Sequence, residues 1–190
     1  MYTHEKCKVK EDRWKRFCAI FVLIFNSNNM RLNKIHHKAN IKLDLTADEQ
    51  KRLRANKIKY SELTEYLVDD LSALLNVPTT RAKEIYALAE FQLIPSIGIK
   101  FAYDLISLGY YSLDELKDKD GAKMIEDLEH LTGTWIDPCV EDQCRLVVDY
   151  ANNHDNSKKW WDFTDERKKY RLENGYSANR PQKAWFELEK

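Results

Sequence analysis

The sequence of 190 residues predicts an all-α fold. Three observations support this prediction. Apolar residues recur with helical spacing along most of the chain after residue 45, and no stretch alternates between apolar and polar residues for long enough to form a sheet. Gly and Pro are also few, at five and four residues. With 43% hydrophobic residues, the chain can bury one substantial core, or two small ones, without disulfides or metal ions.

The first two predicted helices precede Pro78. Thr46, with Glu49 three residues later, forms a capping box that opens the first helix. The second helix follows Ser61 or Thr64. Its apolar face consists of Leu67, Leu71, Leu74 and Leu75.

The third and fourth predicted helices flank the sequence Pro95-Ser96-Ile97-Gly98. The third begins at Thr79 or Thr80, and the fourth closes at Gly109. The expected buried positions of the third helix are Ala82, Ile85, Leu88 and Ala89, with Phe91 as a further candidate. The apolar positions of the fourth helix are Phe101, Ala102, Leu105, Ile106 and Leu108.

Two further helices are predicted before residue 134. Ser112 and Glu115 form a second capping box at the start of a short helix. The sixth helix ends at Gly133. Its apolar residues are Ile125, Leu128 and Leu131.

Asp137-Pro138 is a strong helix start, because an N-cap residue is followed by proline at the first helical position. The stripe that this helix turns to the core consists of Val140, Cys144, Val147 and Ala151. The helix ends near 152–153. A short basic helix follows around 165–173 and stops at Asn174-Gly175, after which the chain is irregular.

The formal net charge of zero hides a partition along the chain. Residues 1–40 carry nine Lys/Arg against three acids, a net of +6. Residues 41–156 carry 13 against 22, a net of −9, and residues 157–183 carry eight against four, a net of +4. A uniform basic coat typical of generic nucleic-acid binding is therefore absent. The acidic pairs Asp69-Asp70 and Glu141-Asp142 are interpreted as solvated charge.

Three segments are expected from this pattern. Residues 1–40 form an extension outside the folded core, 41–133 form the main helical domain, and 134–190 form a C-terminal helix with a basic and aromatic tail packed on it. The apolar run 17–25 is too short for a membrane span, which needs about 20 residues. No cleavage pattern follows it, so the favoured interpretation is an extension with Met30 as an alternative start, over an exported or membrane-surface segment.

The sequence favours a binding module in the cytoplasm over an enzyme. Its four Cys are too few for a disulfide framework and show no paired metal-ligand spacing, which indicates a reducing compartment. No phosphate loop, dinucleotide fingerprint or small-molecule substrate is evident. Cys139 lies inside a helix N-terminus, where the dipole lowers a thiol pKa. Neither His130 nor His154 sits in a motif that orients a base, so an inert, buried Cys139 is favoured.

Two stretches, 75–82 and 95–102, repeat at an offset of twenty residues. Each half reads as helix, tight turn, helix, and the third helix is shared between the turns. The second turn, from Ile94 to Ala102 with Gly109 beyond it, resembles a helix-hairpin-helix motif. A tandem helix-hairpin-helix domain is therefore predicted.

The resemblance implies binding to the DNA backbone without sequence readout. The turn's backbone N–H groups meet a phosphate oxygen at a helix N-terminus, and a following Lys adds positive charge. The residues of this candidate site are Ser96, Ile97, Gly98, Ile99 and Lys100. Some hairpins of this kind also hold a monovalent cation on turn carbonyls; no other cofactor is implied. Ser96 departs from the motif's usual first glycine, and Pro78 replaces the glycine of the upstream copy.

Positive charge is scarce around the hairpin, with three basic residues against five acids between residues 79 and 116. Because non-specific binding depends on several neutralised phosphates, a hairpin that only joins helices or contacts a partner protein is an equal alternative.

A wider resemblance covers roughly residues 43–186. The sequences 108–116, 137–142 and 159–164, together with Arg167, are similar to the pathogenicity-locus family of small bacterial proteins. The resemblance implies a helix-hairpin-helix fold and no assured biochemical activity.

The C-terminal segment interleaves basic and aromatic residues, first in 158–161 and then in 167–171. This composition suits nucleic acid, because aromatic faces stack on bases while Lys and Arg meet phosphates. The basic candidates are Arg167, Lys168, Lys169 and Arg171. In the alternative interpretation the aromatic side chains pack the tail onto the acidic body; these are Trp160, Trp161, Phe163, Tyr176 and Trp185. The leading hypothesis is a DNA-associated binding protein, and the second is a protein-interaction adaptor.

Overall fold

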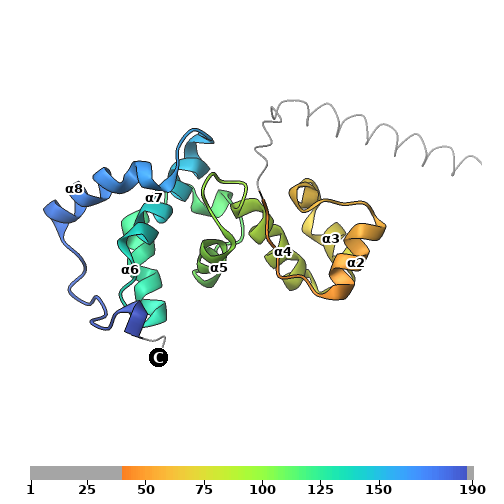
Figure 1. Ribbon diagram of the computed structural model, residues 1–190, viewed down its shortest axis with the longest axis horizontal. Helices are drawn as coiled ribbons and strands as arrows, with labels where there is room; N and C mark the ends of the chain where they lie inside the picture. Colours follow the sequence, from red (N-terminus) through yellow and green to blue (C-terminus); the bar gives the residue numbers. More distant parts are fainter. Residues whose placement is uncertain (1–39, 188–190) are drawn as a thin grey trace, which may run out of the picture. The chain divides into compact units, whose positions relative to one another are not determined.

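The computed structural model describes residues 40–187 of the chain, and the described part is helical (Figure 1). Its α-helices are α2 (Ala47–Ala55), α3 (Val68–Leu75), α4 (Thr79–Phe91), α5 (Ile99–Ser107), α6 (Gly121–Thr132), α7 (Pro138–Asn153) and α8 (Thr164–Asn174). The shorter 3₁₀ helices are Tyr60–Glu65, Asp114–Leu116, Trp160–Phe163 and Trp185–Glu187. Within residues 40–187, β-structure is limited to one isolated bridge between Trp135 and Ala184. The all-α prediction is confirmed for these residues.

The predictions for residues 1–39, including the apolar run and the alternative start, lie outside the described residues. Among those described, no helix combines the length and the apolar character that a membrane crossing requires.

Three predicted helix ends are confirmed by the backbone. Thr46 and Glu49 form the reciprocal capping box of α2, with bonds of 3.2 and 2.7 Å. Asp137 accepts the Cys139 N–H at 2.8 Å at the start of α7. Gly133 ends α6 in the left-handed conformation, with φ of 69°.

Two local predictions are wrong. The second predicted helix is broken in two, because Tyr66 and Leu67 are extended between the 3₁₀ helix and α3. Leu67 is consequently 65% exposed instead of facing the core. Ser112 and Glu115 form no capping box either, because the Glu115 carboxylate accepts the N–H of Tyr111 and only a single 3₁₀ turn follows.

The core consists of two apolar clusters that share α4. The first lies among α2, α3 and α4, where Leu53, Leu71 and Ile85 are fully buried. The second joins α4 to α5, α6 and α7 and includes Phe91 and Leu146. Because α4 buries more than one of its faces, it connects the two clusters, and Figure 1 shows it between α3 and α5.

An extended segment before α2 is fixed to α4 by two side chains, those of Gln92 and Arg81. The Gln92 amide accepts the Lys42 N–H at 3.0 Å and donates to the Lys42 carbonyl at 2.8 Å. Arg81 donates to the Asp44 carbonyl at 2.7 Å. Ile41 is thereby buried in the first cluster.

Candidate nucleic-acid interface

The turn between α4 and α5 contains a left-handed residue, and that residue is Ser96. Its φ is 63°, whereas Gly98 has φ of −106°. The conformation expected of a hairpin glycine is therefore adopted by the serine that replaces the usual first glycine. Gly98 is in an ordinary extended conformation, and a Cβ added there would meet nothing within 4 Å. The left-handed bend of this turn is thus at Ser96 and not at Gly98.

Gly98 is the N-cap of α5 and carries no side chain that could cap the helix. The N–H groups of the first turn, residues 99–101, have no acceptor within the helix, by the geometry of any α-helix start. Ile97 is buried in the second cluster, which fixes the turn to the core. Ser96, Gly98 and Lys100 are exposed, whereas Ile99 is partly buried. Of the five candidate hairpin residues, three are therefore accessible to a ligand.

The basic and aromatic C-terminal segment reaches this turn. The Trp160 N–H donates to Ser96 Oγ at 3.1 Å, although the two residues are 64 positions apart. The Trp160 side chain packs against the second cluster. Trp161 stands beside it with ring centroids 5.3 Å apart and remains 51% exposed. The ammonium of Lys159 lies 5.8 Å from the centre of the Trp161 ring. Two motifs that are distant in the sequence thus form one surface.

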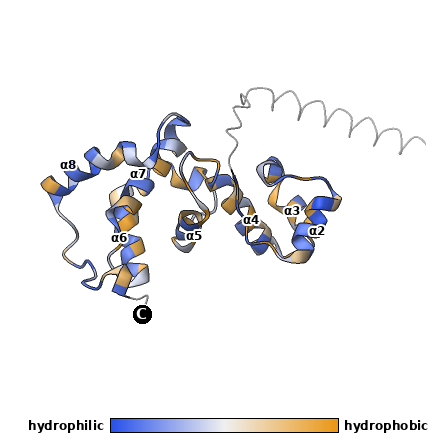
Figure 2. Cartoon of the chain, in the orientation of Figure 1, coloured by the Kyte–Doolittle hydropathy of each residue, from blue (hydrophilic) through white to orange (hydrophobic). Residues whose placement is uncertain are grey.

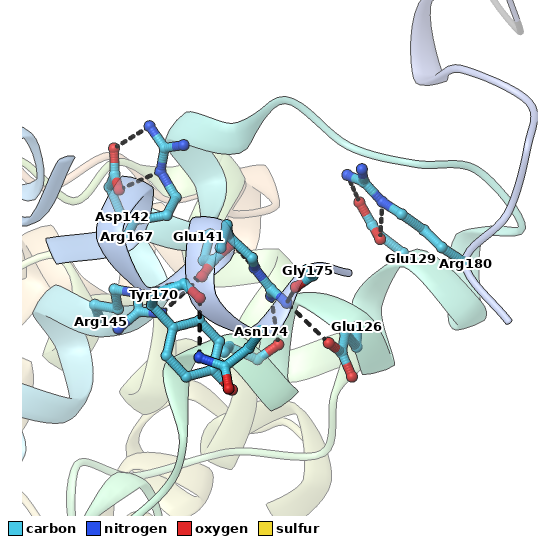
Figure 3. A network of polar contacts seen from close by, with 12 residues as sticks. Glu126, Glu129, Glu141, Asp142, Arg145, Arg167, Tyr170, Asn174, Gly175 and Arg180 are labelled. Atoms are coloured by element: carbon cyan, nitrogen blue, oxygen red, sulfur yellow. Dashed lines mark hydrogen bonds and ion pairs between the residues drawn. The ribbon is translucent and has the colours of Figure 1, made fainter. Parts of the chain in front are cut away.

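The arginines of α8 point the other way, into the protein (Figure 3). Arg167 Nε lies 2.6 Å from Asp142 Oδ1, and Asp142 is completely buried. Arg171 Nε lies 2.9 Å from Glu141 Oε2, and the Arg171 side chain is only 7% exposed. Because both guanidinium groups are occupied by buried carboxylates, neither is accessible to a phosphate.

These contacts correct the interpretation of Glu141 and Asp142 as solvated charge. The side chains of adjacent helix residues point in different directions, yet both Glu141 and Asp142 are buried, because each contacts an arginine of α8. Glu141 also accepts Arg145 at 2.8 Å, and Arg171 reaches Glu126 of α6 at 3.1 Å. Arg180, which follows α8 in the C-terminal segment, forms an ion pair with Glu129 of α6 at 2.6 Å, as Figure 3 shows.

Aromatic rings support the same arginines. The Tyr176 ring lies 4.4 Å from the Arg171 guanidinium carbon and 3.8 Å from that of Arg180. The Trp185 N–H donates to the Trp135 carbonyl at 3.0 Å, and the Trp135 N–H donates to the Lys183 carbonyl at 2.8 Å; these two bonds form the isolated bridge between Trp135 and Ala184. The packing role predicted for the tail is therefore present at Trp160 and Phe163, which pack in the second cluster, and again from residue 164 onward, whereas Trp161 remains exposed.

Lys168 and Lys169 are exposed on α8, which Figure 2 colours mainly as hydrophilic. Leu172, on the same outer side, is 88% exposed. The hydrogen bond that ties the C-terminal segment to the turn comes from Trp160, ahead of α8.

Burial raises the pKa of several titratable groups in residues 90–144. Burial, together with a hydrogen bond to Asp137, raises the pKa of Cys139, which is opposite to the effect expected from the helix dipole. Complete burial also raises the pKa of Cys144. Burial raises the pKa of Glu90, which accepts the Leu113 N–H at 2.9 Å.

The described residues contain no group of three His, Cys, Asp or Glu side chains arranged to bind a metal ion. At the hairpin, the carbonyls of Ile94 and Gly98 already accept the N–H groups of Ile97 and Ala102. The monovalent cation that the hairpin resemblance implies stays a prediction.

The sequence model of a family described as Pathogenicity locus matches residues 84–169. The matched segment runs from α4 into α8, and it includes the turn at Ser96 and the residues Trp160 and Trp161. The predicted resemblance over 43–186 is thus supported over this shorter range. No curated protein and no solved structure matches the chain.

Proposed function

We propose that this protein is a non-catalytic, DNA-associated binding protein that contacts the nucleic-acid backbone independently of sequence. In this proposal α4, the turn around Ser96 and α5 form a helix-hairpin-helix, with α3 and α4 as the first unit of a tandem pair. The observation that carries the proposal is the hydrogen bond from Trp160 to Ser96, because it joins the basic aromatic segment to the uncapped start of α5.

The chemistry available at the turn suits a phosphate. Backbone N–H groups at the start of a helix, assisted by the helix dipole, attract an anion. Lys100 is exposed in the first turn of α5, and Lys159 lies on the attached segment. Neither lysine takes part in an ion pair within residues 40–187. The upstream turn is less suited, because Pro78 is the N-cap of α4 and has no N–H.

The electrostatics predict weak and salt-sensitive binding. Residues 40–187 carry 21 Lys/Arg against 27 Asp/Glu, a net charge of −6. Two lysines neutralise about two phosphates, which corresponds to a slope of roughly −2 in a plot of log K against log salt. Arg167 and Arg171 make no contribution in this proposal because they are paired internally.

The test is duplex binding by the whole chain across salt concentrations. Lys100→Glu should weaken binding uniformly across sequences and reduce the magnitude of the salt slope by about one. Lys51→Glu is the matched control, because Lys51 is an exposed lysine of α2 and the charge change is identical. The control is needed because residues 1–39 carry nine Lys/Arg against three acids, so binding through the hairpin must be separated from general charge attraction.

Neutralising Lys168 and Lys169 together tests whether the outer side of α8 belongs to the DNA-binding surface. If it does, the affinity for duplex DNA should fall further. Equal effects of Lys100→Glu and Lys51→Glu would contradict a site at the hairpin. Absence of binding to duplex, junction and single strand at low salt would end the DNA proposal.

A protein-interaction adaptor is the second candidate function. The net charge of −6 on residues 40–187 favours a basic protein partner over a polyanion. In that case the wild-type chain would fail the low-salt nucleic-acid assay, and a purified partner would bind through the acidic surface in a salt-dependent manner.

A further inference from the structure

Trp161 is an exposed aromatic ring that the surrounding structure holds in place. The residue is 51% exposed, and its ring meets that of Trp160 at 84° with centroids 5.3 Å apart. Trp160 is in turn fixed by the hydrogen bond to Ser96 and by its packing on the second cluster. A large indole surface is thus presented to solvent without the freedom of a loose loop.

Apart from Trp160, the residues that flank Trp161 within 158–162 are charged. Lys158 is bound to Asp149 at 2.9 Å, so that its charge is already satisfied. Asp162 accepts the Lys159 N–H at 2.8 Å, which leaves the Lys159 ammonium near the Trp161 ring. Within residues 158–162, Trp161 is the only large apolar side chain that is exposed, and a cation lies beside its ring.

That combination distinguishes between two kinds of ligand. A protein interface buries an exposed Trp within a larger apolar area, which residues 158–162 do not provide. A nucleotide offers one flat apolar face and one negative charge, and these match an indole with an adjacent ammonium. Bases inside a duplex have both faces covered by their neighbours, so only an unpaired base can stack on Trp161.

We infer that Trp161 is a stacking surface for an unpaired base, so that the preferred nucleic acid is DNA with a single-stranded extension beside a duplex. The inference rests on the proposed function, because the hairpin and Lys100 would contact the duplex backbone while Lys159 would contact a phosphate of the extension. Stacking of one base on an aromatic side chain corresponds to about a tenfold change in affinity.

The experiment compares two DNA probes with the full chain at low salt. One is a dumbbell duplex whose two ends are closed by non-nucleotide linkers, so that it offers neither an unpaired base nor a terminal base face. The other is the same duplex with a single-stranded extension. Trp161→Ala should weaken binding to the extended probe by about tenfold and change dumbbell binding by less than twofold. Trp161→Phe should retain most of the affinity, which guards against a folding defect in the alanine variant.

Phe186→Ala is the matched control. Phe186 is 53% exposed, similar to Trp161, and it packs on Trp135 instead of on the turn. Its replacement should change neither affinity. Quenching of tryptophan fluorescence by the extended probe should also be smaller in Trp161→Phe than in the wild type.

The possible failures are distinguishable. If the dumbbell binds and depends on Lys100, but Trp161→Ala affects both probes equally or neither, the stacking inference is wrong and the proposed function stands. If neither probe binds at low salt, both fail.

Discussion

Asp142 and Glu141 are neighbours on α7, yet each is buried against a different arginine of α8. Asp142 also accepts the Thr164 hydroxyl at 2.9 Å, so both its oxygens are used. A buried pair of this kind gives a modest net stabilisation, but removal of one partner leaves a charge without compensation. Replacing one partner of the pair should therefore destabilise the protein more than replacing both partners with apolar residues.

Asp142→Ala should lower the free energy of unfolding by about 3 to 5 kcal/mol, because Arg167 would be left buried and unpaired. The double variant Asp142→Leu with Arg167→Leu should be less destabilised than Asp142→Ala alone. Urea denaturation measures both, and Lys168→Ala, on the exposed side of α8, should cost less than about 0.5 kcal/mol. A double variant worse than the single one would contradict the pairing.

Glu90 supplies a prediction about pH. Burial raises its pKa above the ordinary value of 4.5, so the folded protein binds this proton more tightly than the unfolded chain does. The stabilisation from the protonated carboxyl is present below pH 4.5 and is lost as the pH rises through the folded-state pKa. Glu90→Gln should therefore become more favourable relative to the wild type between pH 4 and pH 7, as measured by urea denaturation across that range.

Glu49 provides the opposite case as a control. Its hydrogen bond from Arg81 at 3.0 Å is the main cause that lowers the pKa of this carboxyl below 4.5. The stabilisation from this carboxylate is present above pH 4.5 and is lost as the pH falls through the folded-state pKa. Glu49→Gln should accordingly be most costly near pH 7 and least costly in acid. Profiles that run in the same direction for the two variants would contradict one of the two assignments.

At the scale of elements, α8 is held mainly by polar contacts. Arg171 links it to Glu126 of α6 and Glu141 of α7, and also donates to the carbonyls of Ala122 and Gly175. A planar guanidinium can serve several acceptors in fixed directions, whereas an ammonium cannot. The attachment of α8 thus depends on the shape of this group as well as on its charge.

Arg171→Lys should loosen α8 although it conserves the charge. Hydrogen exchange of the amides in α8 should become faster, while amides of α4 should exchange at wild-type rates. Lys169→Arg is the control on the outer side of the same helix, where no change is expected. Uniform acceleration in α4 and α8 would indicate global destabilisation instead.

Most helix boundaries were predictable because their signals are local. A capping box or an Asp-Pro start depends on residues within three positions of one another, as at Thr46 and Asp137. The partners of α8 lacked such a signal, because Arg167 and Arg171 lie 25 and 30 residues from their carboxylates. Their spacing of four residues does place them on one helix face, which hinted at a shared partner surface.

The candidate site was predictable in part for the same reason. The turn residues and the aromatic stretch stood out separately in the sequence, but the bond between Ser96 and Trp160 spans 64 residues. The break at Leu67 had no local warning either, since the leucines around it keep a helical spacing.

At the scale of the molecule, α4 connects the two apolar clusters of the described part. Ile85 belongs to the first and Phe91 to the second, and both are fully buried. If α4 detaches from one cluster, it also exposes apolar surface of the other cluster. Residues 40–187 should therefore unfold as one cooperative unit.

Leu71→Ala in the first cluster tests this coupling. The substitution should cost about 2 to 5 kcal/mol, because Leu71 is completely buried. Every tryptophan among the described residues follows position 134, so fluorescence in a Trp14→Phe background reports on the C-terminal half. The fluorescence and far-UV circular dichroism transitions should shift together, whereas Leu172→Ala should move neither. A fluorescence transition that stays in place would show two independent units.

Ser96 has a consequence for how this surface could change during evolution. A left-handed serine costs about 1 to 2 kcal/mol relative to glycine, and the hydrogen bond from Trp160 returns about 0.5 to 1.5 kcal/mol. Because the two contributions nearly cancel, exchanging serine and glycine at this position changes the free energy of unfolding very little, and selection on stability does not oppose it. What does change is the attachment of the C-terminal segment. A lineage could therefore gain or lose a second contact surface beside the turn by drift, without first passing through a less stable ancestor.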